Sequence, residues 1–116
     1  MLVWFEIPVT DLERATAFYE AVFNITFTPE DTPEGQKRSL FPGGVGSLAH
    51  GTEWTPSQDG TIVYLDGGDD LQVILDRAVA HGGTIVEPKQ PVMATQGFWG
   101  RFRDTEGNII GVLSPH

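Results

Sequence analysis

The sequence of 116 residues predicts a single α+β domain that consists of two tandem βαβββ modules. The first observation is the order of the expected elements, which runs strand, helix and three strands and then repeats. The second is that Leu12 and Leu71 occupy matching places early in the two expected helices. The third is that FPGGVGSLAH, from Phe41, and FRDTEGNIIG, from Phe102, both indicate strand, turn and strand, with a glycine before the second strand. The resulting repeat of about 60 residues divides the chain into module one (1–52), a linker (53–59) and module two (60–116).

The first module opens with the apolar segment from Leu2 to Pro8, whose aromatic and β-branched residues predict a strand. Thr10 then begins a helix, because Glu13 three residues later completes a T-x-x-E capping box. Apolar residues recur along this helix at helical spacing and predict one buried face: Leu12, Ala15, Phe18, Tyr19 and Val22. Three short strands are expected to follow, at 25–28, 38–41 and 47–50, with a polar loop, PEDTPEGQK, before the second of them.

The second module repeats this pattern from a strand at Thr61 to Asp66. Asp70 begins its helix, which ends at the HGG sequence that starts at His81. The apolar face of this helix is Leu71, Ile74, Leu75 and Ala78. The remaining strands are expected at 84–87, 98–103 and 108–113, with PKQPVMATQG as the loop after the first and DTEG as the hairpin turn.

Charge and composition exclude several classes of function. Seven basic residues against sixteen acidic residues give a net charge of −9, which repels phosphate backbones and argues against a nucleic-acid partner. The same charge favours solubility, with a cationic ligand as the lesser alternative. No apolar run approaches the roughly 20 residues of a membrane-spanning helix, and no basic and apolar leader is present, so we expect a cytoplasmic protein. The absence of cysteine excludes disulfides and thiolate-ligated metals.

Three stretches of the chain resemble the vicinal-oxygen-chelate superfamily of glyoxalase I, bleomycin resistance proteins, fosfomycin-resistance enzymes and extradiol dioxygenases. FEIPVTDLERATAFYEAVFN resembles its opening strand and helix, and LDRAVAHGGTIVEPKQPV resembles its second helix and the next strand. FRDTEGNIIGVLSP resembles its closing hairpin, with Thr105 in place of the usual proline. The chain is most similar to small single-domain glyoxalase-related proteins. The resemblance implies a concave mixed sheet with the helices outside, and a homodimer in which the cleft lies at the interface.

The resemblance also carries the metal positions of the superfamily onto this sequence. Metal-dependent members place His or Glu at four strand positions, which fall here at Trp4, His50, Ile62 and Gly111. Only His50 is a metal-binding residue type, whereas a divalent metal site needs about three or four protein ligands. Glu6 shares the strand face of Trp4 and supplies one more carboxylate. We therefore expect no cofactor, with a divalent metal on His50 and Glu6 as the less favoured alternative.

Strand alternation predicts an aromatic cleft around one acid. Alternation places Trp4 and Tyr64 on the cleft face. The resemblance implies that Arg101, three residues before the turn aspartate, also faces the ligand, and Trp99 shares its strand face. The expected ligand-binding residues are therefore Trp4, Tyr64, Trp99 and Arg101. Glu6 and His50 are the candidate catalytic residues, because a carboxylate desolvated by tryptophans has a raised pKa and serves as a general acid or base. The alternative for Glu6 is an ion pair with Arg101 that burial demands. The alternative for the two tryptophans is packing in the core or at a dimer interface.

These residues leave three functions open. The first is a protein of the bleomycin-resistance type that binds a small molecule without the full metal site of the family. The second is a glyoxalase-related lyase or isomerase that uses Glu6 or His50, with or without a divalent metal. The third is a module that mainly dimerises and binds no ligand. Glyoxalase I and extradiol dioxygenase activities are disfavoured, because three of the four metal positions hold no donor.

Overall fold

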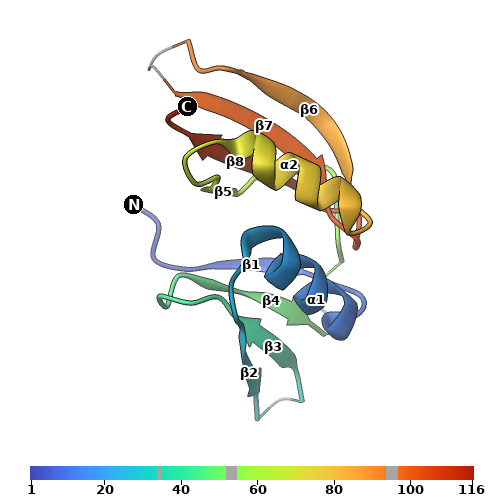
Figure 1. Ribbon diagram of the computed structural model, residues 1–116. Helices are drawn as coiled ribbons and strands as arrows, with labels where there is room; N and C mark the ends of the chain where they lie inside the picture. The colour runs from blue at the N-terminus through green and yellow to red at the C-terminus, as the bar shows by residue number, and fades with distance from the viewer. Residues whose placement is uncertain (34, 52–54, 94–96) are drawn as a thin grey trace.

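Each module folds into its own four-stranded mixed sheet, with one helix packed across one face (Figure 1). The computed structural model describes residues 1–33, 35–51, 55–93 and 97–116. The first module contains β1 (Phe5–Pro8), α1 (Leu12–Phe23), β2 (Thr28–Asp31), β3 (Lys37–Leu40) and β4 (Gly46–His50). The second contains β5 (Tyr64–Asp66), α2 (Leu71–Ala80), β6 (Thr84–Pro91), β7 (Phe98–Arg103) and β8 (Ile109–Ser114). The predicted α+β fold is therefore confirmed, although residues 53 and 54 of the expected linker lie outside the described residues.

The two sheets have the same topology. Their strand orders are β1-β4-β3-β2 and β5-β8-β7-β6, so the opening strand of each module lies at an edge. That edge strand pairs in parallel with the last strand of its own module, and the other strand pairs are antiparallel. The internal repeat expected from the sequence is thus a repeat of strand topology.

The start of α1 differs from the prediction. Asp11 is the N-cap and accepts a hydrogen bond from the backbone N–H of Arg14 at 3.0 Å, so the capping box of Thr10 and Glu13 is wrong. The two backbone N–H groups just outside the helix, those of Thr10 and Asp11, donate to Glu106 in the β7–β8 turn, each at 2.9 Å. A carboxylate at a helix N-terminus is stabilised by the helix dipole. Because this carboxylate comes from the other module, no pattern within the helix indicates it.

Two strand predictions are also wrong. The structure places β2 after the expected 25–28 strand, inside the segment expected to be a polar loop. Asn24 ends α1 in the left-handed conformation (φ 56°), and the chain then turns so that Phe27 is buried in the core. The polar residues of β2 are extended because they pair with β3, and this pairing overrides their low strand propensity. Similarly, β6 continues to Pro91 through two register shifts against β7 instead of ending at Glu87.

The two modules share one core on the helix side. Helices α1 and α2 lie side by side in Figure 1 and contact each other. The ring of Phe102, from β7, packs against the rings of Phe18, Tyr19 and Phe23, from α1, at centroid distances of 5.9, 6.4 and 6.2 Å. The core therefore crosses the module boundary. No helix within the described residues is long and apolar enough to cross a membrane.

Polar groups of the β7–β8 turn join the modules at the same place. The Tyr19 hydroxyl donates to Asp104 Oδ2 at 2.6 Å, and Asn108 Nδ2 donates to the backbone oxygen of Pro8 at 2.7 Å. Burial raises the pKa of the Asp104 carboxyl and raises the pKa of the Tyr19 phenol well above its ordinary value. Packing and hydrogen bonds thus join the two modules on the helix side of the sheets.

Candidate ligand-binding site

We call the sheet faces opposite the helices the open faces. Strand alternation puts Tyr64, Trp99 and Arg101 on the open face of the second module, because Leu65, Phe102 and Val112 of the same strands pack toward the core. The same rule puts Glu6, Arg38 and Ser47 on the open face of the first module.

Three of the predicted ligand-binding residues come together on the second open face. Arg101 Nε donates to the Tyr64 hydroxyl at 2.7 Å. The guanidinium carbon of Arg101 lies 4.8 Å from the centroid of the Trp99 ring and 5.6 Å from that of the Tyr64 ring. Both distances are within the range of cation–π attraction. The aromatic rings and the hydrogen bond together hold the arginine side chain across the sheet.

Gly111 makes this arrangement possible. It lies on β8 directly between Tyr64 on β5 and Arg101 on β7. A Cβ atom at this position would stand 2.3 Å from two carbons of the Tyr64 ring. The absence of a side chain therefore lets the phenol ring lie over β8 and reach Arg101. Gly111, which the sequence analysis assigned to an expected metal position, therefore leaves room for an aromatic ring.

A shallow hollow adjoins these rings. It has a volume of about 260 Å³ and is lined by Tyr64, Val92, Trp99 and Leu113, and we call it the aromatic hollow. Sequence reasoning missed Val92, because its segment was expected to be a loop. The extension of β6 to Pro91 is what carries Val92 to the edge of the open face.

The open face of the first module contains an ion pair. Glu6 Oε2 accepts hydrogen bonds from Arg38 Nε at 2.7 Å and from Ser47 Oγ at 3.2 Å. Arg38 Nη1 also lies 3.4 Å from Glu30 Oε1. The predicted pairing of Glu6 with Arg101 is therefore wrong. The partner is Arg38, which the sequence analysis missed. Its position three residues before the core residue Phe41 was the available signal, because an odd offset along an extended chain reverses the face.

The structure separates the two candidate catalytic residues. Glu6 lies opposite Ser47 on β4, in the way that Tyr64 lies opposite Gly111 on β8. His50 is three residues beyond Ser47, and an odd offset reverses the strand face, so His50 shares the face of the core residue Leu48. His50 is exposed at the end of β4. The match of His50 with Gly111 is therefore wrong, and Glu6 and His50 project from opposite faces of one sheet.

The structure also bears on Trp4 and on the possibility of a metal site. Trp4 precedes β1 and is 41% exposed, so strand geometry does not fix its side chain. Within residues 1–33, 35–51, 55–93 and 97–116, no group of three or more His, Cys, Asp or Glu side chains is placed to hold a metal ion.

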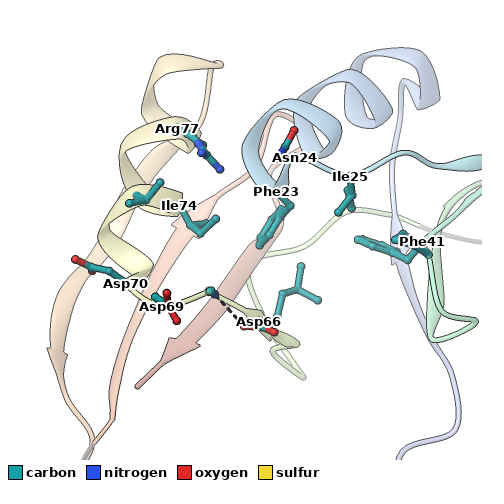
Figure 2. Close-up of a pocket in the computed structure, with 14 residues that line it drawn as sticks. Phe23, Asn24, Ile25, Phe41, Asp66, Asp69, Asp70, Ile74 and Arg77 are labelled. Atoms are coloured by element: carbon teal, nitrogen blue, oxygen red, sulfur yellow. Dashed lines mark hydrogen bonds between the residues drawn. The ribbon is translucent and has the colours of Figure 1, made fainter. Parts of the chain in front are cut away.

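A larger pocket of about 570 Å³ lies on the helix side, between the end of α1 and the start of α2 (Figure 2). Its floor is apolar, with Phe23 and Ile74 projecting into it, and its rim carries Asp66, Asp70 and Arg77. These rim groups support local structure: Asp66 accepts from Gly68 N, Asp70 accepts from Gln72 N and Lys89 Nζ, and Arg77 Nη1 donates to the Val22 backbone oxygen. The hydrogen bond from Lys89, followed by that from Gln72 N, lowers the pKa of Asp70.

Comparison with known proteins identifies the family. The model of the glyoxalase/bleomycin resistance protein/dioxygenase superfamily matches residues 1–112. A glyoxalase/bleomycin resistance protein from Albidiferax ferrireducens T118 superposes with a TM-score of 0.73 at 19% identity, over 98% of each chain. A glyoxalase-related enzyme from Fulvimarina pelagi gives 0.72 at 16% identity, over 98% of this chain and 87% of that one.

A family enzyme from Burkholderia phytofirmans PsJN superposes with a TM-score of 0.71 at 15% identity, over 98% of each chain. At these identities the likenesses establish the fold alone. The search of curated proteins found no match. The family match covers nearly the whole chain and agrees with the two βαβββ modules of the structure, so the chain belongs to the glyoxalase/bleomycin resistance protein/dioxygenase superfamily.

Proposed function

We propose that this protein binds a small molecule at the aromatic hollow, without the complete metal site of its family. The observation that carries the proposal is the cluster of Tyr64, Trp99 and Arg101 beside that hollow. Apolar and aromatic walls with a few converging polar groups are the usual composition of a small-molecule site. In contrast, the rim of the larger helix-side pocket consists mainly of groups that cap α2 or stabilise its preceding turn.

The residues at the metal positions of the family do not fit a divalent cation. Trp4, Ile62 and Gly111 offer no side-chain donor that metals use. His50 projects from the face opposite Glu6, so these two residues of one chain do not converge on a shared ion. We therefore derive no step of the function through a metal.

The second candidate is lyase or isomerase chemistry with Glu6 or His50 as the base. This candidate is favoured by Glu6, a carboxylate on an open face whose side chain is 26% exposed. The ion pair with Arg38 and the hydrogen bond from Ser47 occupy one oxygen of this carboxylate, however, and His50 faces away. The geometry supports binding better than it supports proton transfer.

A ligand screen tests the proposal. We expect a library of small molecules, screened by thermal shift with and without divalent metal, to contain compounds that stabilise the wild-type protein. These compounds should lose their effect on Trp99→Leu, which removes one wall of the aromatic hollow, and keep it on Asp69→Asn, which changes the rim of the helix-side pocket. Compounds that respond only to Asp69→Asn would move the site to the other pocket. Turnover of a compound by the wild type but not by Glu6→Gln would favour the enzymatic candidate.

We also propose that two chains form a homodimer. Large apolar residues are exposed along the open face of the second module, where Tyr64 is 37% and Leu113 46% exposed, and Trp4 is 41% exposed next to β1. A second chain that covers part of these faces would remove them from water. Sedimentation equilibrium at micromolar concentration should therefore give twice the mass of 12.7 kDa, and the mass should fall on Leu113→Glu. A monomer at every concentration would contradict the proposal.

A further inference from the structure

We infer that the ligand of the aromatic hollow is a small flat anion, an aromatic carboxylate, whose negative charge pairs with the guanidinium of Arg101. This inference rests on the proposed binding function and names its ligand class. It follows from a difference between two arginines that lie on the open faces of corresponding strands, β3 and β7.

The two open faces carry related arrangements that differ in register and in partners. Arg38 lies opposite Ala49, two residues along β4 from the partner of Glu6, whereas Arg101 lies directly opposite Gly111, the partner of Tyr64. In the first module, Arg38 on β3 reaches across β4 to Glu6 on β1. In the second, Arg101 on β7 reaches across β8 to Tyr64 on β5. Both arginines donate through Nε at 2.7 Å. The charge of Arg38 is balanced by Glu6 and Glu30. Arg101 meets a neutral phenol, and no carboxylate among the described residues lies within the 4.0 Å of an ion pair with it.

Arg101 keeps hydrogen-bond donors for a ligand. A guanidinium has five N–H groups, and in the described part of the chain only the Nε–H of Arg101 has a protein acceptor. The four N–H groups on the two Nη atoms form the fork that binds a carboxylate through two parallel hydrogen bonds. Because the Tyr64 oxygen accepts from Nε, its own proton points elsewhere and is a further donor on the same face.

The aromatic hollow sets the shape of the ligand. The rings of Tyr64 and Trp99, which contact the guanidinium of Arg101, also line the hollow, together with Val92 and Leu113. A volume of about 260 Å³ is just below the range of about 300–1,000 Å³ for drug-sized ligands. A flat ligand of one ring system therefore fits the hollow while its carboxylate lies at Arg101.

The net negative charge of the chain opposes the binding of an anion. The attraction must therefore come from the nearby guanidinium of Arg101. The net charge is −9, and Glu87 lies directly opposite Arg101 on β6. The carboxylate of Glu87 accepts from Gln90 Nε2 at 3.4 Å rather than from Arg101. Replacing it by Gln removes a nearby repulsion and should strengthen anion binding by about threefold, the size expected of a screened charge at a protein surface.

Three probes of one shape and different charge test the inference: 2-naphthoate, 2-naphthamide and 2-naphthylmethylammonium. We expect NMR titration of the wild type, followed at the indole N–H of Trp99, to show naphthoate binding about tenfold tighter than the amide, as a solvent-accessible charge-assisted pair predicts. Arg101→Gln should remove this preference, because it should weaken naphthoate far more than the amide. Arg38→Gln, the matched control on the first module, should keep this preference, and Glu87→Gln should increase it by about threefold.

A second variant separates the charge from the aromatic wall. Gly111→Ala forces the Tyr64 ring off β8 and so should weaken both naphthoate and the amide, whereas Arg101→Gln should weaken naphthoate far more than the amide. Trp99→Leu, followed by calorimetry, supplies the same comparison if Gly111→Ala does not fold. Equal binding of the amide and the carboxylate, or tighter binding of the cation, would overturn the anion inference and leave the proposed function standing. Failure of all three probes to shift the Trp99 signal would overturn the inference too. The proposed binding function would then be tested by the thermal-shift screen alone.

Discussion

Replacing Glu106 with alanine is expected to lower the free energy of unfolding by about 3 kcal/mol, because the change removes several hydrogen bonds to one carboxylate, each of which contributes about 1 kcal/mol or more. The Glu106 side chain is fully buried and ion-paired with Arg14 at 2.8 Å. It accepts further hydrogen bonds from the backbone N–H groups of Thr10 and Asp11 and from the hydroxyls of Thr10 and Thr105. The substitution removes all of these at once and frees the N-terminus of α1 from the second module.

The effect should depend on pH with a defined sign. Burial acts to raise the pKa of Glu106, but the hydrogen bonds from Arg14, Asp11 N, Thr105 and Thr10 outweigh it and lower that pKa from 4.5 to about 2. A carboxyl with a lowered pKa in the folded state stabilises the fold above pH 4.5 and loses this contribution as the pH falls toward 2. Asp104, whose pKa burial raises, contributes with the opposite sign.

Comparison with Glu106→Gln isolates the charge. Urea unfolding of the wild type and of this variant should differ most at pH 6, and the difference should shrink between pH 4.5 and 2. Subtracting one protein from the other cancels the contribution of Asp104, which both retain. A difference that is constant over this range would show that the carboxylate charge does not stabilise the folded state. Glu30→Gln, at an exposed carboxylate of β2, is the matched control and should change little.

Phe102→Ala is expected to lower the free energy of unfolding by about 4 kcal/mol, as large-to-small substitutions of buried aromatic residues do. Phe102 is fully buried on β7, and its ring contacts three aromatic rings of α1. The substitution therefore leaves a cavity where the two modules pack against each other. The packing of α1 against β7 holds the modules together, so the lost stabilisation is that of the interface between the modules rather than that of one module.

Urea unfolding followed by circular dichroism and by tryptophan fluorescence measures this effect. We expect one transition for the wild type with both probes, and a midpoint well below it for Phe102→Ala. Val86→Ala, on β6 where the side chain is 37% exposed, is the control and should cost less than about 1 kcal/mol. Equal costs for the two substitutions would contradict a shared core. Separate transitions in the wild type would show that the modules unfold independently.

Local signals in the sequence predicted much of the fold. The apolar spacing of α1 and α2 places Ala15, Phe18, Leu71 and Ile74 in the core as expected, and Asp70 caps α2 as expected. These features depend on neighbours within one or two turns of helix, so a short window of sequence contains the information. The repeat of strand, helix and three strands was visible for the same reason.

Part of the candidate site could also be predicted from the sequence. Tyr64, Trp99 and Arg101 share one face because alternation along β5 and β7 holds over short regular strands. The pairing of Arg101 with Tyr64 itself depends on Gly111, whose lack of a side chain is seen as a functional feature only when the strand between them is known.

By itself, then, the sequence determined the superfamily, the two modules, both helices and the face of the second sheet that carries an arginine between aromatic rings. Only the tertiary structure decided that Glu6 pairs with Arg38, that His50 faces the helix side and that Glu106 stabilises the N-terminus of α1. The physical reason is register. Partners on strands far apart in sequence are set by the alignment of whole strands in the sheet, and an odd shift of that alignment turns a side chain to the opposite face.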